Sequence, residues 1–271
     1  MKEIIIQSKT SFRSSLKEIW DYRELFYFLA WRDVKVRYKQ TVIGVAWALL
    51  QPFITMVVFS VFFGRVAGIQ TSGIPYALFT FVGLLFWNYF SNSLSSASDS
   101  MISNRGIIQK VYFPRIILPL SSTLVFLLDF ICALILFFVL ALFFQQKIYI
   151  WGILFIIPAL IISFLCASGF GLVAASLNVK YRDIRYALPF FIQTLIFVSP
   201  VIYPVSVLGK YQWLWFLNPM SGVIETARNL LFMTSPVNWG LFFSSAIVSL
   251  LIFLAGIWYF SKTEKWFADI V

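Results

Sequence analysis

The sequence predicts an all-α membrane protein with six transmembrane helices, on three observations. Of its 271 residues, 61% are hydrophobic and only 12% are charged, which is about half the charge of an average soluble domain. The apolar runs are about 20 residues or longer and do not alternate with polar residues, which favours helices over strands. Lysine and arginine gather in segments that would all lie on one side of the membrane.

The first predicted element is an amphipathic surface helix at residues 22–40, after a tail of mixed charge. Its apolar side chains fall on one helical stripe, formed by Tyr22, Leu25, Phe26, Leu29 and Val36. Its last turns carry the basic residues Arg32, Lys35, Arg37 and Lys39, and no charge follows from Thr41 to Gly64. A basic surface helix that leads directly into an apolar run marks the cytoplasmic side of the membrane. A plain membrane anchor and an anchor that also docks a partner both fit this pattern.

Six apolar segments are each about long enough to span a bilayer, at residues 43–63, 76–96, 116–144, 149–177, 188–208 and 237–260. With the amino terminus inside, 17 of the 21 Lys and Arg residues lie on the cytoplasmic side, and four lie outside (Arg65, Lys147, Lys210, Arg228). This bias predicts that both termini are cytoplasmic. The amino-terminal residues lack the apolar core of a signal peptide. We expect one membrane domain over residues 1–271.

The last external segment, residues 209–236, is half apolar and is interrupted by Pro219 and Pro236. Each apolar piece is too short to span the bilayer, so two short helices are expected. We favour re-entrant helices that dip into the outer leaflet, with helices lying flat at the interface as the alternative.

Two cytoplasmic loops are candidates for contact with another protein. The loop at 97–115 is longer and more patterned than a connection requires, with a break at Arg105–Gly106 and a short amphipathic turn from Ile107 to Tyr112. The loop at 178–187 carries three basic residues around one acid (Lys180, Arg182, Arg185 and Asp183). For both loops, a role in membrane orientation alone is the alternative.

Two features inside the predicted spans concern charge and packing. Asp129 is the only acidic residue deep within a span, where an ionised carboxylate costs about 3 kcal/mol. We favour a hydrogen bond to a hydroxyl of another span over a proton relay, because no charged partner lies in a neighbouring span. The fourth span has small residues at four-residue spacing, which predicts close helix packing (Ser163, Ala167, Gly171, Ala175).

The composition argues against chemistry within this chain. The sequence has no histidine, which removes the commonest general base and the commonest metal ligand, and we expect neither a catalytic nor a metal site. A phosphate-binding loop requires the pattern GxxxxGK[ST], but the only Gly–Lys pair, Gly209–Lys210, is followed by Tyr211. Any ATP-driven work therefore needs another subunit.

Aromatic residues make up 20% of the chain, and some are placed to line a pathway, because aromatic rings stack on the apolar faces of sugars. The candidates are Trp47, Phe53, Phe59 and Phe63 in the first span and Phe191, Phe197 and Tyr203 in the fifth. Both spans also contain proline, at Pro52, Pro200 and Pro204, and the carbonyls that proline frees need partners. Packing against lipid or core is the alternative for any single ring.

Several motifs resemble those of the membrane subunits of ABC-2 type polysaccharide exporters, which export O-antigen, capsule or teichoic acid chains across bacterial inner membranes. They are WRDVKVRY and IGVAWALLQP, NRGIIQKVYFPRIILPLS, NVKYRDIRYALP with SPVIYP, and LNPMSGVIE. The resemblance extends from about Tyr22 to Trp258 and so includes nearly the whole chain.

The resemblance implies a homodimer in the inner membrane that works with two copies of a separate cytosolic ATPase. ATP and Mg²⁺ would bind that partner, this chain would hold no cofactor, and no nucleic acid is expected to bind. Residues 22–40 would be the interface helix and 97–115 the coupling loop. The candidates for contact with the ATPase are Asp99, Asn104, Arg105, Gln109, Lys110, Tyr112, Arg182, Asp183 and Arg185. The seven aromatic residues would line a channel between protomers, and segment 209–236 would form its outer gate.

The implied substrate is a polysaccharide on a polyprenyl diphosphate lipid, with O-antigen favoured and teichoic acid, capsule, a small lipid or a drug as alternatives. Its diphosphate would meet Arg32, Lys35, Arg37 and Lys39. Two other classes fit less well. A membrane enzyme acting on lipid-linked sugars is disfavoured by the lack of histidine and by the scattered acids. A proton-coupled transporter using Asp129 is disfavoured because the sequence has no internal repeat.

Overall fold

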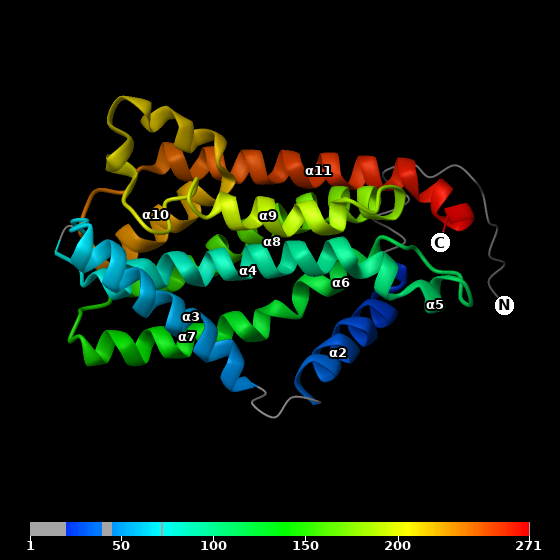
Figure 1. Ribbon diagram of the computed structural model, residues 1–271, viewed down its shortest axis with the longest axis horizontal. Coiled ribbons are helices and arrows are strands. Elements are labelled where there is room, and N and C mark those ends of the chain that lie inside the picture. Colours follow the sequence, from blue (N-terminus) through cyan, green and yellow to red (C-terminus); the bar gives the residue numbers. More distant parts are fainter. Residues whose placement is uncertain (1–19, 40–44, 72, 271) are drawn as a thin grey trace.

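The computed structural model describes residues 20–39, 45–71 and 73–270 (Figure 1). Within these residues all regular secondary structure is helical, as predicted. In chain order the elements are α2 (Arg23–Lys39), α3 (Val45–Phe59), the π-helix η1 (Ser60–Val66), α4 (Tyr76–Ser103), α5 (Arg105–Ile108), α6 (Ile117–Leu124), α7 (Phe126–Phe143), α8 (Ile150–Lys180), α9 (Ile184–Leu195), the 3-10 segment η2 (Val205–Leu217), α10 (Pro219–Phe232) and α11 (Trp239–Ile270). Most of the predicted tail and the junction at 40–44 lie outside the described residues.

Four stretches within the described residues are long and apolar enough to cross a membrane, namely Ala46–Val66, Ile117–Phe143, Ile150–Lys180 and Trp239–Glu264. They coincide with the first, third, fourth and sixth predicted spans. The chain is therefore a multi-pass membrane protein. Helices of this length can cross the hydrocarbon core, because their backbone N–H and C=O groups are hydrogen-bonded within the helix and need no partner from the lipid.

The second predicted span lies in α4, which at 28 residues is about 42 Å long and exceeds the hydrocarbon thickness. It is not among the four most apolar stretches, because serine and asparagine interrupt its second half.

The fifth predicted span, 188–208, is not one helix. Helix α9 has 12 residues and ends at Leu195, so it is about 18 Å long and shorter than the hydrocarbon core. The chain then continues in turns before η2 begins at Val205. The reason is local, because Pro200 and Pro204 cannot donate the backbone hydrogen bonds that a continued helix needs.

Helix α8 lies at the centre of the bundle and packs against α4, α10 and α11. The predicted small-residue face is buried at Ser163, Ala167, Gly171 and Ala175. A Cβ added to Gly171 would lie 2.6 Å from the Cβ of Ala97 on α4, so the two helices meet at a distance that only glycine permits. The predicted packing role of this face is confirmed.

The two ends of the bundle carry different elements (Figure 1). Helix α5, the α8–α9 connection and the carboxyl-terminal part of α11 lie at one end, which we call the α5 end. Helix α10 and η2 lie at the other, the α10 end. Helix α2 runs obliquely to the bundle near the α5 end, and α3 and α9 lie on either side of α4.

Candidate functional site

Helix α2 is held against the bundle by its apolar stripe. Leu29 is buried, and Tyr22, Leu25 and Phe26 pack with it against a cluster that includes Phe113, Ile117 and Phe260. Val36, which was predicted to belong to the same stripe, is instead exposed. Helix α2 is thus docked on protein over its first turns, and its last turns are free of this cluster.

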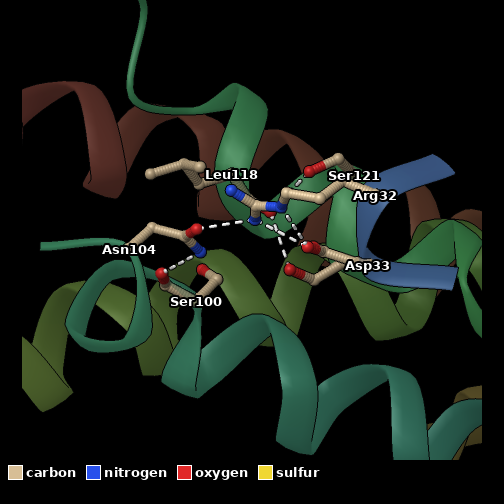
Figure 2. A network of polar contacts seen from close by, with 7 residues as sticks. Arg32, Asp33, Ser100, Asn104, Leu118 and Ser121 are labelled. Atoms are coloured by element: carbon tan, nitrogen blue, oxygen red, sulfur yellow. Dashed lines mark hydrogen bonds and ion pairs between the residues drawn. The ribbon is translucent and has the colours of Figure 1, made fainter. Parts of the chain in front are cut away.

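The Arg32 side chain is half-buried and bonds to other residues of the chain. Its Nε and Nη2 atoms donate to Oδ1 of Asp33 at 2.8 and 2.6 Å. Nη2 also donates to Oδ1 of Asn104 at 2.7 Å, and Asn104 Nδ2 donates to the carbonyl of Ser100 at 2.8 Å (Figure 2). This network joins α2 to the α4–α5 junction through side-chain hydrogen bonds.

Arg37 and Asp129 form an ion pair between α2 and α7. Arg37 Nη2 donates to Asp129 Oδ2 at 2.8 Å, and the Tyr38 hydroxyl donates to Oδ1. The Arg37 guanidinium also lies 4.5 Å from the ring centroid of Phe126. Burial and the Asp129 carboxylate raise the pKa of Tyr38, so its hydroxyl stays protonated as a donor. The predicted partner of Asp129 was a hydroxyl of another span, which is wrong, because both partners lie on α2.

A groove of about 930 Å³ lies between α2, α4, α5 and α6. Most of its lining residues are polar or charged, and they include Arg32, Asp33, Arg37, Asp99 and Lys110. A smaller cavity of about 30 Å³ adjoins it through Arg37 and Phe126 and is bounded by α3, α4 and α7.

The four basic residues predicted to meet a diphosphate divide into two kinds. Arg32 and Arg37 are engaged with internal carboxylates. Lys35 and Lys39 are exposed, with the Lys35 ammonium 5.5 Å from the ring centroid of Trp31. Of these four residues, Lys35 and Lys39 are therefore the two exposed ones that are not paired with Asp33 or Asp129.

The loop after α4 has a short exposed tip, Gln109–Tyr112, and the residues that follow it are packed against the bundle. Helix α5 is a single turn, and Gln109, Lys110 and Tyr112 beyond it are exposed, as is Arg105. Phe113 is buried, and the amide and guanidinium of Arg115 donate to Glu264 of α11 at 3.2 and 2.9 Å. The exposed tip can therefore contact a partner protein while the residues beside it stay packed.

The remaining candidates for ATPase contact lie at the same end but differ in exposure. Asp99 accepts a hydrogen bond from Asn178 Nδ2 at 3.0 Å, which ties the end of α4 to the end of α8. Arg182 and Asp183 are exposed on the α8–α9 connection, and Arg185 is exposed in the first turn of α9. Asp99 and Asn104 therefore support the base of this surface, while the exposed residues form its outer face.

The aromatic candidates also divide into exposed and packed side chains. Trp47, Phe53, Phe191 and Phe197 are exposed. Phe59 and Phe63 stack edge to face at 5.7 Å and pack against the core. Tyr203 is also packed there, 6.0 Å from the Trp215 ring, and its hydroxyl donates to the carbonyl of Phe197. The exposed four are therefore more accessible than the half-buried Phe59, Phe63 and Tyr203.

At the α10 end, sequence reasoning missed Arg228, which it treated as one more external cation. Arg228 is 1% exposed. Its guanidinium donates to the carbonyls of Phe79, Pro200 and Val201, with distances of 2.9 Å to Phe79 and 2.6 Å to Val201. The pairing of Arg228 with Glu225 one helical turn earlier, at 3.9 Å, is a signal that the sequence did offer.

Arg228 completes a set of side chains that satisfy the irregular segment after α9. The carbonyls of Phe197, Val198, Pro200, Val201 and Ile202 accept from Tyr203, Asn218, Arg228, Arg228 and Tyr76 respectively. Non-helical backbone in a membrane protein requires such partners, because lipid supplies none. Side-chain hydrogen bonds therefore stabilise the irregular backbone between α9 and η2.

Comparison with known proteins identifies the family. The family model of the ABC-2 type transporter matches residues 24–232, which includes α2 and all elements through α10. The chain belongs to the ABC-2 type transporters. As a permease of this family it is a membrane transport subunit, in agreement with the helical fold.

Two relatives of this ABC-2 permease carry the name O-antigen export system permease protein RfbA. The one from Klebsiella pneumoniae is 29% identical over 89% of this chain and 92% of its own length. The one from Myxococcus xanthus is 27% identical over 94% of this chain and 98% of its own length. The polysialic acid transport protein KpsM of Escherichia coli is 22% identical over 73% of this chain and 77% of its own length.

Proposed function

We propose that this chain is the membrane subunit of an ATP-driven exporter that moves a lipid-linked O-antigen polysaccharide across the bacterial inner membrane. The observation that carries the proposal is the match to O-antigen export permeases over nearly the full length of both chains. Two copies of the chain would enclose the channel, and two copies of a separate cytosolic ATPase, holding ATP and Mg²⁺, would drive it.

The arrangement of the α5 end supports a contact with such an ATPase. The exposed tip at Gln109–Tyr112 and the exposed α8–α9 connection lie at the same end of the bundle. Beneath the tip, the Arg32–Asn104 hydrogen bond joins the loop to α2. A push on the tip would therefore reach α2, and through the Arg37–Asp129 pair it would reach α7. We place this end, and both termini, in the cytoplasm.

The α10 end supports an outer gate, because η2 exposes aromatic side chains while α10 is buried in the bundle. Helix α10 has 14 residues and is about 21 Å long, which is too short to cross the hydrocarbon core. We propose that η2 and α10 enter the outer leaflet and return without crossing. We also propose that α4 and the α9 segment cross the membrane, which with the four apolar stretches makes six passages.

Export of capsular polysaccharide is a second candidate, and similarity to the polysialic acid transport protein favours it. Teichoic acid, a small lipid or a drug are the further alternatives for an ABC-2 exporter. A proton-coupled mechanism through Asp129 is disfavoured, because Asp129 is paired with Arg37 and accepts from Tyr38. Export by an Asp129→Asn variant should therefore still be driven by ATP.

The experiment that tests the proposal is complementation of a chromosomal deletion in the native host. Wild-type chain should restore surface polysaccharide. A variant with Gln109–Tyr112 replaced by Gly/Ser, which keeps Asn104, Phe113 and Arg115, should reach the membrane at the wild-type level and export at least about tenfold less polymer. Unchanged surface polysaccharide in the deletion strain would reject the export function, and normal export by the tip variant would reject the coupling role.

A further inference from the structure

Helix α11 is joined to the loop that bears the exposed tip by a reciprocal pair of hydrogen bonds. The backbone amide of Arg115 donates to Oε1 of Glu264 at 3.2 Å, and Nη1 of Arg115 donates to the backbone carbonyl of Glu264 at 2.9 Å. Each residue thus contributes one backbone group and one side-chain group, and both residues are half-buried. Such a pair holds the backbone of the loop as well as the Arg115 side chain.

Arg115 lies where the exposed tip meets the bundle. It lines a hollow of about 220 Å³ together with the tip residues Gln109–Tyr112. On the other side of Arg115, Ile116 and Ile117 are buried where α6 begins. The Arg115–Glu264 pair therefore holds the loop at the point where the chain passes from the tip into the bundle.

Apolar packing on both sides brings the two residues of the pair together. Phe113, shortly before Arg115, and Phe260, shortly before Glu264, belong to one buried cluster at the α5 end. Phe260 and Glu264 are about one helical turn apart and lie on the same face of α11. Leu29 of α2 is a member of the same cluster. Helix α2, the base of the loop and α11 therefore share one small core.

Helix α11 is longer than crossing the membrane requires. Its apolar stretch, Trp239–Glu264, has 26 residues and is about 39 Å long, whereas the hydrocarbon core is about 30 Å thick. The last turn of this stretch, residues 261–264, is polar. Glu264 therefore lies beyond the hydrocarbon at the α5 end, where its carboxylate does not bear the cost of burial in lipid.

The opposite end of α11 contacts the elements proposed to form the outer gate. Helix α11 packs against α10 and η2. Ser245 Oγ accepts from the backbone amide of Gly222 at 2.9 Å, and a Cβ added to Gly222 would lie 2.2 Å from the carbonyl oxygen of Leu241. Backbones that pack this closely cannot shift independently, because the interior has no free volume to receive them. One continuous helix therefore connects the base of the loop with α10.

We propose that Glu264 is a positioning residue for coupling, which holds the base of the loop on α11 so that movement of the tip moves α11 and α10 with it. Without this contact, the backbone between Tyr112 and Ile116 would absorb the movement. The inference rests on the proposed function, because it requires a partner ATPase that contacts the tip. The rival role is purely structural, in which the pair stabilises the fold and coupling does not depend on it.

The ratio of polymer exported to ATP hydrolysed separates the two roles. Wild-type and variant chains are compared for surface polysaccharide in the deletion strain and, as complexes purified with the ATPase, for ATP hydrolysis. Glu264→Ala removes the acceptor of the Arg115 amide and should lower export about tenfold, with bound ATPase and ATP hydrolysis within about twofold of wild type. Glu264→Gln keeps an acceptor oxygen and should retain most export. Lys262→Ala, which changes an exposed residue of the same helical turn, is the matched control and should retain all of it.

Arg115→Ala is a second, independent variant, because it removes the Nη1 donor and leaves Glu264 in place. It should reproduce the loss of coupling even where Glu264→Ala fails to reach the membrane. Export that falls only in proportion to membrane level in both Ala variants, loss of the bound ATPase, or failure of Glu264→Gln to retain export would overturn the positioning role. If the wild-type chain neither restores export nor binds an ATPase, the proposed function fails and this inference fails with it. If wild type does both and the Ala variants export normally, the positioning role alone is wrong.

Discussion

The ion pair between Arg37 and Asp129 gives the most informative perturbation of the link between α2 and the bundle. Arg37→Ala leaves the Asp129 carboxylate in α7 with only the Tyr38 hydroxyl as partner. Asp129→Asn removes the charge and its need for a cation, and it keeps an oxygen that can accept from Tyr38. The two substitutions should therefore differ in cost, although they break the same contact.

The magnitude follows from the exposure of the two side chains, which is 38% for Arg37 and 16% for Asp129. A fully exposed pair contributes at most about 1 kcal/mol, whereas breaking a buried pair costs about 3–5 kcal/mol. The intermediate exposure predicts about 2 kcal/mol for Arg37→Ala and about 1 kcal/mol for Asp129→Asn. The double variant should cost no more than Asp129→Asn alone, which is a coupling energy of about 2 kcal/mol.

The assay is thermal unfolding of the purified chain in mild detergent, where 1 kcal/mol corresponds to about 2–4 °C in Tm. Arg37→Ala should lower Tm most, and adding Asp129→Asn to it should restore part of the loss. Lys39→Ala, which removes an exposed cation from the same helix, is the control and should leave Tm unchanged. Strictly additive losses in the double variant would refute the pairing.

Three further substitutions follow from single contacts. Arg228→Met should destabilise the fold by at least about 3 kcal/mol in a denaturation series, because buried carbonyls at Phe79, Pro200 and Val201 lose their donor; loss under about 1 kcal/mol would contradict this. Gly171→Ala should cost about 1–3 kcal/mol through overpacking, and Ala97→Gly should recover it, because the added Cβ meets the Ala97 Cβ. Tyr38→Phe should remove the loss of stability expected as pH rises above about 10, since the folded chain holds this pKa above that of the unfolded chain.

Much of the fold could be predicted because lipid imposes one simple requirement on long segments. The stretches within α3, α6–α7, α8 and α11 are long and predominantly apolar, and they were found at nearly their observed positions. The packing face of α8 was also visible, because small residues at four-residue spacing along an apolar helix are typical of close helix contact.

The fifth span could not be predicted, because its stability comes from other parts of the chain. Apolar composition at 188–208 favours a helix, but Pro200 and Pro204 leave carbonyls that need donors. Those donors are Tyr76, Asn218 and Arg228, which lie in other elements of the sequence. Sequence patterns report local periodicity and do not report such partners.

The polar contacts of α2 were missed for the same reason. Arg37 and Asp129 are 92 positions apart, and Arg32 and Asn104 are 72 apart, so no spacing rule connects them. The basic residues were correctly expected to cluster on this helix, but the sequence could not tell which cations have partners inside the protein.

The central claim is that this ABC-2 permease is driven by a separate ATPase, and co-purification tests it most directly. The tagged chain is expressed in its native host, extracted in mild detergent and analysed for bound proteins and for ATP hydrolysis. We predict one ATPase subunit per permease chain, with ATP hydrolysis in the purified complex and loss of the ATPase when Gln109–Tyr112 is replaced. Purification of the chain alone, with polysaccharide export unaffected by its deletion, would contradict the account.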